Sequence, residues 1–149
     1  MDAVVFSRQT DEWSTPQAFF DALDAEFGFG LDAAATAENT KCLRWLADAL
    51  GVDWSEMASG RPIWLNPPYS KIGAFVDKAA ESAANGCTVV LLIPSRTDTK
   101  WWHRYIWDKD THHWRLGVSG RFLQGRLKFG DGNNSAPFQS VVIVMRPIQ

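Results

Sequence analysis

Residues 64–69 read Trp-Leu-Asn-Pro-Pro-Tyr, so a short apolar segment runs directly into two prolines. Proline has no backbone N–H and its ring holds φ near about −65°, so the pair cannot lie inside a helix or a central strand. The residue before a proline is also held extended. The sequence therefore predicts a strand over residues 63–65 that ends in a stiff turn, with the Asn66 side chain and the Pro67 carbonyl held in fixed directions.

This proline turn presents groups that suit an amine. The side-chain oxygen of Asn66 and the carbonyl oxygen of Pro67 both accept hydrogen bonds, so together they can hold an –NH₂ group with two protons to donate. Tyr69 adds an aromatic face on which a flat ring can stack. We therefore predict that Asn66, Pro67, Pro68 and Tyr69 are the catalytic residues of a methyl transfer to an amino group. The alternative is a surface Asn-Pro turn that binds nothing.

On both sides of the turn, segments with helical spacing of apolar residues alternate with short apolar runs. Thr15 is placed to cap the first helix, and Pro16 suits its first position. The expected helices cover residues 16–27, 38–50, 71–85 and 99–108, and the expected strands cover residues 29–34, 63–65, 88–93, 114–118 and 140–145. This alternation predicts an α/β fold with a mostly parallel central sheet and helices on both faces.

Ligands of such sheets bind outside the carboxyl ends of the strands, which predicts that Asp32, Asn66 and Pro94 lie along one rim. Asp32 is followed by three alanines, so a ligand ammonium or hydroxyl can approach its carboxylate closely; capping of a turn is the alternative role. Asp53 and Trp54 form a second candidate pair, which can hold an adenine through its amino group and its ring face. A glycine-rich G-x-G-x-x-G motif is missing, which argues against a dinucleotide site.

Composition and charge are those of one domain with a local basic surface. The chain has 149 residues and only two cysteines, which indicates free thiols in a reducing compartment. We see no signal peptide and no apolar stretch long enough to cross a membrane. The net charge is −2, but residues 96–128 contain eight basic and three acidic side chains. Binding of a polyanion needs only such a local surface, although chance unevenness of surface charge is the alternative.

Six short segments are spread over nearly the whole chain. They read Asp11-Glu12-Trp13-x-Thr15-Pro16, Leu31-Asp32-Ala33-Ala34-Ala35 with Glu38-Asn39-x-Lys41-Cys42, Asp53-Trp54, Trp64-Leu65-Asn66-Pro67-Pro68-Tyr69-Ser70, Pro94-x-Arg96-Thr97-Asp98-Thr99-x-Trp101-Trp102-His103, and Gly125-Arg126-Leu127-Lys128-Phe129 with Ala136-Pro137-Phe138. In this order they resemble the phage-type DNA N6-adenine methyltransferases, the Dam-like family of phages and prophages.

The resemblance implies a Rossmann-like methyltransferase fold that binds S-adenosyl-L-methionine. The length predicts a single methyltransferase domain over residues 1–149, without a separate target-recognition domain. The resemblance implies that it acts in the cytoplasm of a bacterial host. The expected cofactor-binding residues are Trp13, Thr15, Pro16, Asp32, Ala33, Asp53, Trp54 and Asn66.

The expected substrate is an adenine in double-stranded DNA, which must be flipped out of the duplex to reach the catalytic turn. The candidate DNA-binding residues are Arg96, Thr97, Thr99, Lys100, Arg104, Arg126 and Lys128. The chain would then read DNA with its loops, as a homodimer, or with little sequence selectivity. No metal and no membrane are expected as partners, and the adjacent His112 and His113 would point apart in a strand.

Two other functions use parts of the same sequence pattern. A protein-glutamine N5-methyltransferase applies the same tetrapeptide to an amide nitrogen, but that family carries a glycine-rich cofactor loop that is missing here. A catalytically inactive DNA-binding module would keep the basic segment, and the intact residues 66–69 argue against it.

Overall fold

The structure, a computed structural model, describes residues 14–129, 134–135 and 138–148. Trp13, expected at the cofactor, and Ala136 and Pro137, part of the last sequence motif, lie outside the described residues. Among the residues that are described, no helix is long and apolar enough to cross a membrane.

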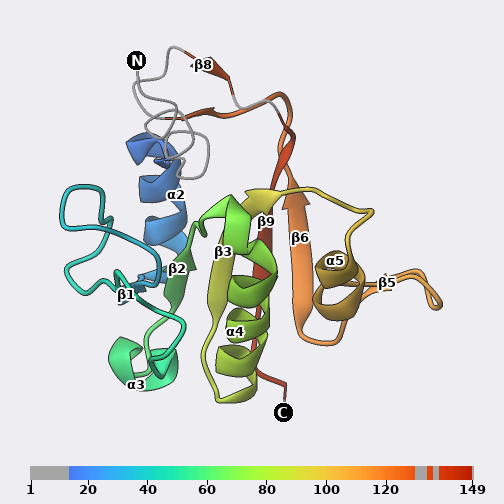
Figure 1. Ribbon diagram of the computed structural model, residues 1–149, viewed down its shortest axis with the longest axis horizontal. Coiled ribbons are helices and arrows are strands. Elements are labelled where there is room, and N and C mark those ends of the chain that lie inside the picture. The colour runs from blue at the N-terminus through green and yellow to red at the C-terminus, as the bar shows by residue number, and fades with distance from the viewer. Residues whose placement is uncertain (1–13, 130–133, 136–137, 149) are drawn as a thin grey trace.

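A five-stranded sheet forms the centre of the molecule, with the strand order β1-β2-β3-β9-β6 (Figure 1). Its strands are β1 (Leu31–Asp32), β2 (Ile63–Leu65), β3 (Val89–Pro94), β9 (Ser140–Met145) and β6 (Val118–Phe122). The pairs β1–β2 and β2–β3 are parallel, whereas β9 pairs antiparallel with both β3 and β6. The α/β class is thus confirmed, but the sheet is mixed.

The expectation of a mostly parallel sheet is therefore wrong, because β9 runs against its two neighbours along the two longest ladders. Since β3 and β6 both pair antiparallel with β9, β6 runs in the same direction as β1, β2 and β3. The strand itself was predicted over residues 140–145. Its run of apolar residues indicates burial on both faces, but such a run carries no information about direction.

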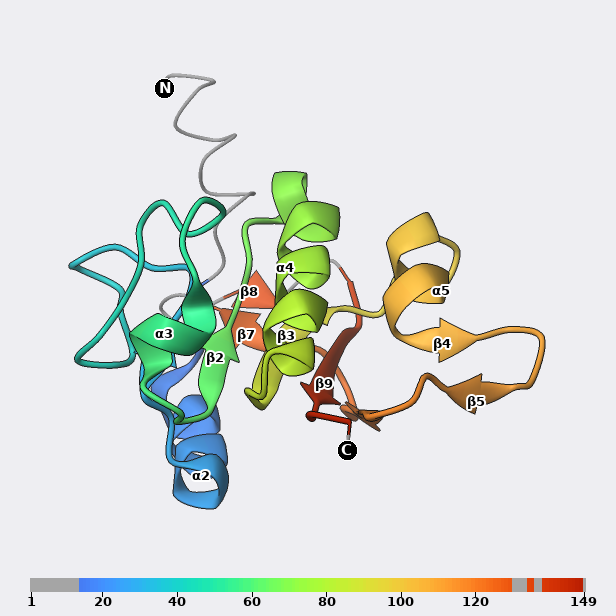
Figure 2. The ribbon, with the colours of Figure 1, turned by 90° about the horizontal axis from the view of Figure 1, so that it is seen from below.

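Helices cover both faces of the sheet, as predicted. Helix α2 (Gln17–Phe27) packs on one face, and α4 (Ile72–Ala84) packs on the other (Figure 2). Short helices α3 (Trp54–Ala58) and α5 (Lys100–Tyr105) lie on the α4 side, and a 3-10 turn at Tyr69–Lys71 leads into α4.

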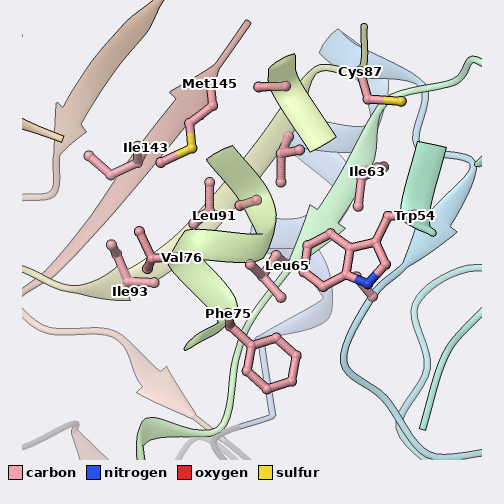
Figure 3. Close-up of a cluster of buried hydrophobic side chains, with 14 of the residues drawn as sticks. Trp54, Ile63, Leu65, Phe75, Val76, Cys87, Leu91, Ile93, Ile143 and Met145 are labelled. Carbon is pink, nitrogen blue, oxygen red and sulfur yellow. The ribbon is translucent and has the colours of Figure 1, made fainter. Parts of the chain in front are cut away.

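Alternation of side chains along the strands separates the core into two clusters. Leu65, Leu91 and Ile143 point to the α4 side, where they belong to the same cluster as Phe75 and Trp54 (Figure 3). The intervening residues of the same strands point to the α2 side, and these are Trp64, Val90, Leu92, Val142 and Val144. Both faces of β3 and β9 are thus buried, which explains their continuous apolar sequence.

The helix predicted over residues 38–50 is wrong, because residues 36–50 form an irregular loop. The loop lies against β1, where the backbone N–H groups of Asp32 and Leu46 donate to the carbonyls of Arg44 and Asp32. Leu43 is fully exposed, whereas Leu46 and Leu50 pack against the core, so the three leucines do not form one buried helical face. The backbone of this loop therefore forms hydrogen bonds with β1 in place of the hydrogen bonds of a helix.

Two further elements differ from the predicted layout. The helix expected over residues 99–108 ends at Tyr105, and β4 (Trp107–Asp108) then pairs with β5 (His113–Trp114) in a hairpin. The strand expected over residues 114–118 is therefore divided between this hairpin and β6. A short two-stranded ribbon, β7 (Lys128–Phe129) with β8 (Asn134–Ser135), lies apart from the main sheet.

Candidate active site

A pocket opens at the carboxyl ends of β1 and β2, where the sequence predicted a ligand rim. Asp32 ends β1, and Asn66 follows β2 immediately. The pocket is lined by Thr15, Asp32, Ala34, Ala35, Thr36, Asn39, Lys41, Ala47, Trp64, Asn66, Pro67, Pro68 and Phe75. The structure thus brings Asp32 and the proline turn together, whereas Pro94, expected on the same rim, is not part of this lining.

The proline turn is held by a contact that the sequence did not reveal. The Nδ2 of Asn66 donates to Oγ1 of Thr15 over 3.0 Å, and Thr15 is 5% exposed. The prediction that Thr15 caps α2 is wrong. Pro16 occupies the capping position, with an extended ψ of 134°, and no side chain caps the helix. Thr15 thus lies one residue before the capping position, and its hydroxyl accepts from Asn66 and not from the helix.

Tyr69 lies at the end of the turn with its ring half buried. Its ring meets Phe138 edge-on, with 5.0 Å between centroids and 82° between planes. Burial raises the pKa of the Tyr69 phenol above its ordinary value, although the nearby Arg96 guanidinium opposes the shift. The phenol is therefore neutral throughout the ordinary pH range.

Asp32 is a buried carboxylate at the floor of the pocket, only 3% exposed. Its Oδ1 accepts from the Ala34 N–H at 3.3 Å, and its Oδ2 accepts from the Lys41 N–H at 3.0 Å. Burial raises the pKa of Asp32 to about 6, against the lowering effect of these two hydrogen bonds and of the Lys41 charge. Asp32 is thus ionised at neutral pH, but only by a small margin.

The loop over residues 36–47 forms one wall of the pocket. Asn39 Oδ1 accepts from the Thr36 N–H at 2.7 Å, and Lys41 Nζ donates to Gln17 Oε1 of α2 at 2.9 Å. Our sequence reasoning assigned no site role to these loop residues, since a helix was expected there. The turn-forming residue types Thr36, Asn39 and Thr40 were the signal that could have indicated a loop.

Asp53 and Trp54, both predicted to bind the cofactor, do not line this pocket. Asp53 Oδ1 caps α3 by accepting from the N–H groups of Ser55 and Glu56. Trp54 is completely buried, and its Nε1 donates to the Ala49 carbonyl at 2.9 Å. Trp54 therefore has no exposed ring face for an adenine, whereas the side chain of Asp53 is exposed outside this pocket.

Ala33, also predicted at the cofactor, is completely buried, and its backbone N–H donates to the carbonyl of Trp64 in β2. Ala33 does not line the pocket, whereas Ala34 and Ala35 do.

Comparison with known proteins assigns the chain to a family. The family model described as DNA N-6-adenine-methyltransferase (Dam) matches residues 3–149. The chain belongs to this family.

Two curated relatives carry the same description. A DNA N-6-adenine-methyltransferase of Escherichia phage T1 is 31% identical over 155 aligned positions, which cover 93% of this chain and 64% of the relative. A DNA N-6-adenine-methyltransferase of Haemophilus phage HP1 is 36% identical over 97 positions, which cover 61% of this chain and 54% of the relative. The chain thus spans less than two thirds of the length of either relative.

In this member of the Dam family, the basic segment is exposed at most of its predicted DNA-binding positions. The side chains of Arg96, Thr97, Lys100, Arg104, Arg126 and Lys128 are exposed, while Thr99 caps α5 by accepting from the Trp102 N–H. Two other cations of the segment serve the fold instead. Arg121 pairs with both carboxylate oxygens of Glu26, and Arg115 donates to the backbone carbonyl of His103.

Proposed function

We propose that this protein transfers a methyl group from S-adenosyl-L-methionine to the N6 amino group of a flipped adenine in DNA. The observation that carries the proposal is the shared pocket of Asp32 and the Asn66–Pro67–Pro68 turn. Membership of a family described as DNA N-6-adenine-methyltransferases supports the choice of base and substrate. In this proposal residues 1–149 act as one methyltransferase domain in the cytoplasm of a bacterial host.

The pocket fits the chemistry of this cofactor. Asp32 offers a buried carboxylate to an ammonium or hydroxyl group, and the small side chains of Ala34, Ala35 and Ala47 leave room beside it. S-adenosyl-L-methionine supplies an electrophilic methyl group whose leaving group is a neutral thioether. The proposed cofactor residues are therefore Asp32, the three alanines and the Thr15–Pro16 segment, without Asp53 and Trp54.

Asn66 and Pro67 act on the amine. The N6 lone pair of adenine is delocalised into the ring, so the amine is a poor nucleophile. Hydrogen bonds from its two N–H groups to Asn66 Oδ1 and the Pro67 carbonyl favour a pyramidal nitrogen and stabilise positive charge as it develops. After methyl transfer, the nitrogen loses one proton to solvent and becomes the neutral N-methyl amine. Since the leaving group needs no acid, alignment of the amine is the main contribution of the protein.

Tyr69 and the basic segment act on the DNA. An adenine inside a duplex cannot reach the turn, so the base is flipped and stacks on the Tyr69 ring. Arg96 supports this role, because its charge already acts on the Tyr69 phenol and it is exposed at the carboxyl end of β3. The exposed cations then hold the phosphates around the flipped base.

The direct test is transfer of labelled methyl groups to unmethylated DNA, followed by sequencing of the modified positions. We expect the label on N6 of adenine. Label on cytosine, or on glutamine side chains of added protein and not on DNA, would reject the proposal.

A further inference from the structure

Gln139 lies at the edge of the sheet where two strands end and a third begins. β3 and β6 both end at this edge, and β9, which runs against them, starts there with the residue after Gln139. The residue before it, Phe138, meets the Tyr69 ring edge-on. Gln139 therefore lies between the loops that follow β3 and β6, close to the ring on which the flipped base is proposed to stack.

Gln139 forms hydrogen bonds with both of these loops. Its backbone carbonyl accepts from the Ser95 N–H at 2.8 Å and from the Ser95 Oγ at 3.1 Å. Its side-chain Nε2 donates to the carbonyls of Leu123 and Gly125, to the second of them over 3.2 Å. Since a backbone carbonyl can only accept, the two carbonyls require the NH₂ end of the Gln139 amide at this place.

The segment that the Gln139 side chain holds, residues 123–128, leads from β6 into β7. Two of its leucines pack against the core cluster on the α2 side, and two of its basic side chains are exposed; these are Leu123 and Leu127, and Arg126 and Lys128. The segment is thus fixed to the sheet by apolar contacts and by the Gln139 amide, while its cations remain accessible.

We propose that Gln139 is a positioning residue that holds segment 123–128 in the conformation that binds DNA, an inference that rests on the proposed function. A segment that is ordered before binding does not pay the entropic cost of ordering when DNA binds, so the affinity is higher. The Gln139 side chain acts on affinity through Arg126 and Lys128 and does not itself contact DNA.

The test compares Gln139→Met with Gln124→Met. Methionine has a similar length but no donor, so we expect the Kd for DNA to rise about tenfold in Gln139→Met, the equivalent of one or two net hydrogen bonds. KM for DNA should rise with it, while kcat at saturating DNA and the affinity for S-adenosyl-L-methionine stay unchanged. The slope of log affinity against log salt should also stay unchanged, because Arg126 and Lys128 still reach the phosphates once the segment is ordered on the DNA.

Gln124→Met is the matched control. Gln124 is an exposed glutamine of the same segment, and its side chain forms no hydrogen bond with any residue that the structure describes. Its variant should keep the original Kd.

A double-mutant cycle separates positioning from direct contact with DNA. In a background with both Arg126→Ala and Lys128→Ala, Gln139→Met should cause no further loss of affinity, because the side chains to be positioned are gone. A further tenfold loss in that background, an unchanged Kd in Gln139→Met alone, or an equal loss in Gln124→Met would each overturn the proposal.

A second readout needs no DNA. Trypsin cleaves after arginine and lysine, and cleavage inside a folded segment requires local opening. Cleavage after Arg126 and Lys128 should be faster in Gln139→Met than in the original protein and unchanged in Gln124→Met; equal rates in all three would overturn the inference. If the original protein binds DNA but transfers no methyl group, the proposed function fails and the binding comparison still decides this inference. If it binds no DNA, both fail.

Discussion

The two ends of the sheet are built differently. At one end, β1 and β2 contain two and three residues, and β1 also exchanges backbone hydrogen bonds with the loop at residues 44–46. Toward the other end, where β6 forms the edge, β3 and β9 contain six residues each and pair along their whole length. The pocket lies at the first end and the longest buried strands lie at the second. The molecule thus separates the groups proposed to react from the ladders that hold the fold, and this separation can be tested.

The largest effect is expected at the short end, from Asn66→Ala. Removal of one acceptor for the amine should lower the rate of methyl transfer by about 10²–10³. Single-turnover transfer to DNA measures this. The melting temperature should stay close to that of the original protein, since Asn66 is not in either core cluster. The cofactor affinity should also change little, because in the proposed function Asn66 binds the adenine amine and Asp32 binds the cofactor. Near-normal methylation by this variant would remove the central claim of the mechanism.

The opposite result is expected at the long end, from Ile143→Ala. Ile143 is completely buried in β9, so its truncation should lower the free energy of unfolding by about 2–5 kcal/mol. Urea denaturation measures the loss. The variant should keep its kcat at temperatures where it is folded. A large drop in kcat with little loss of stability would show that the two ends are coupled.

A third comparison concerns DNA binding by exposed basic side chains and by Arg121, which is paired with Glu26. Replacing Arg96, Arg126 and Lys128 together with alanine should weaken binding to all sequences and lower the slope of log affinity against log salt by about three, one for each lost phosphate contact. Arg121→Ala is the control, because that guanidinium is bound to Glu26. Fluorescence anisotropy at several salt concentrations distinguishes them. Equal slopes for both variants would contradict the assignment of the DNA surface.

The smallest effect is expected from the titration of Asp32. The unfolded carboxyl titrates near 3.8 and the folded one near about 6, so the folded state binds the extra proton between these values. The contribution of Asp32 to stability is thus present below 3.8 and is lost as the pH rises to about 6, by at most about 3 kcal/mol.

Cofactor affinity should change in the other direction over the same interval, because an ammonium or hydroxyl donor needs the ionised carboxylate. Calorimetric titrations should therefore show binding that weakens as the pH falls below about 6. In Asp32→Asn both pH dependences should disappear. If the cofactor affinity of the original protein stays constant between pH 3.8 and about 6, Asp32 does not bind the cofactor.

The sequence predicted the parts of the molecule whose structure is local. The proline turn, α4 and β3 follow from backbone restrictions and from uninterrupted apolar periodicity. Prediction from the sequence failed where the structure depends on contacts between residues that are far apart in the chain. The direction of β9, the loop at residues 36–50 and the burial of Trp54 all depend on neighbours far away in the chain. The Thr15–Asn66 bond belongs to the same class.

The position of β9 also affects how the chain can be made. Synthesis runs from the amino terminus, so β1, β2, β3 and β6 all leave the ribosome before residues 140–145. Until β9 inserts, β3 and β6 are not joined, and the apolar β3 is an open edge. Open apolar edges favour pairing with other chains. The strand that completes the sheet last is therefore the one that protects it from aggregation.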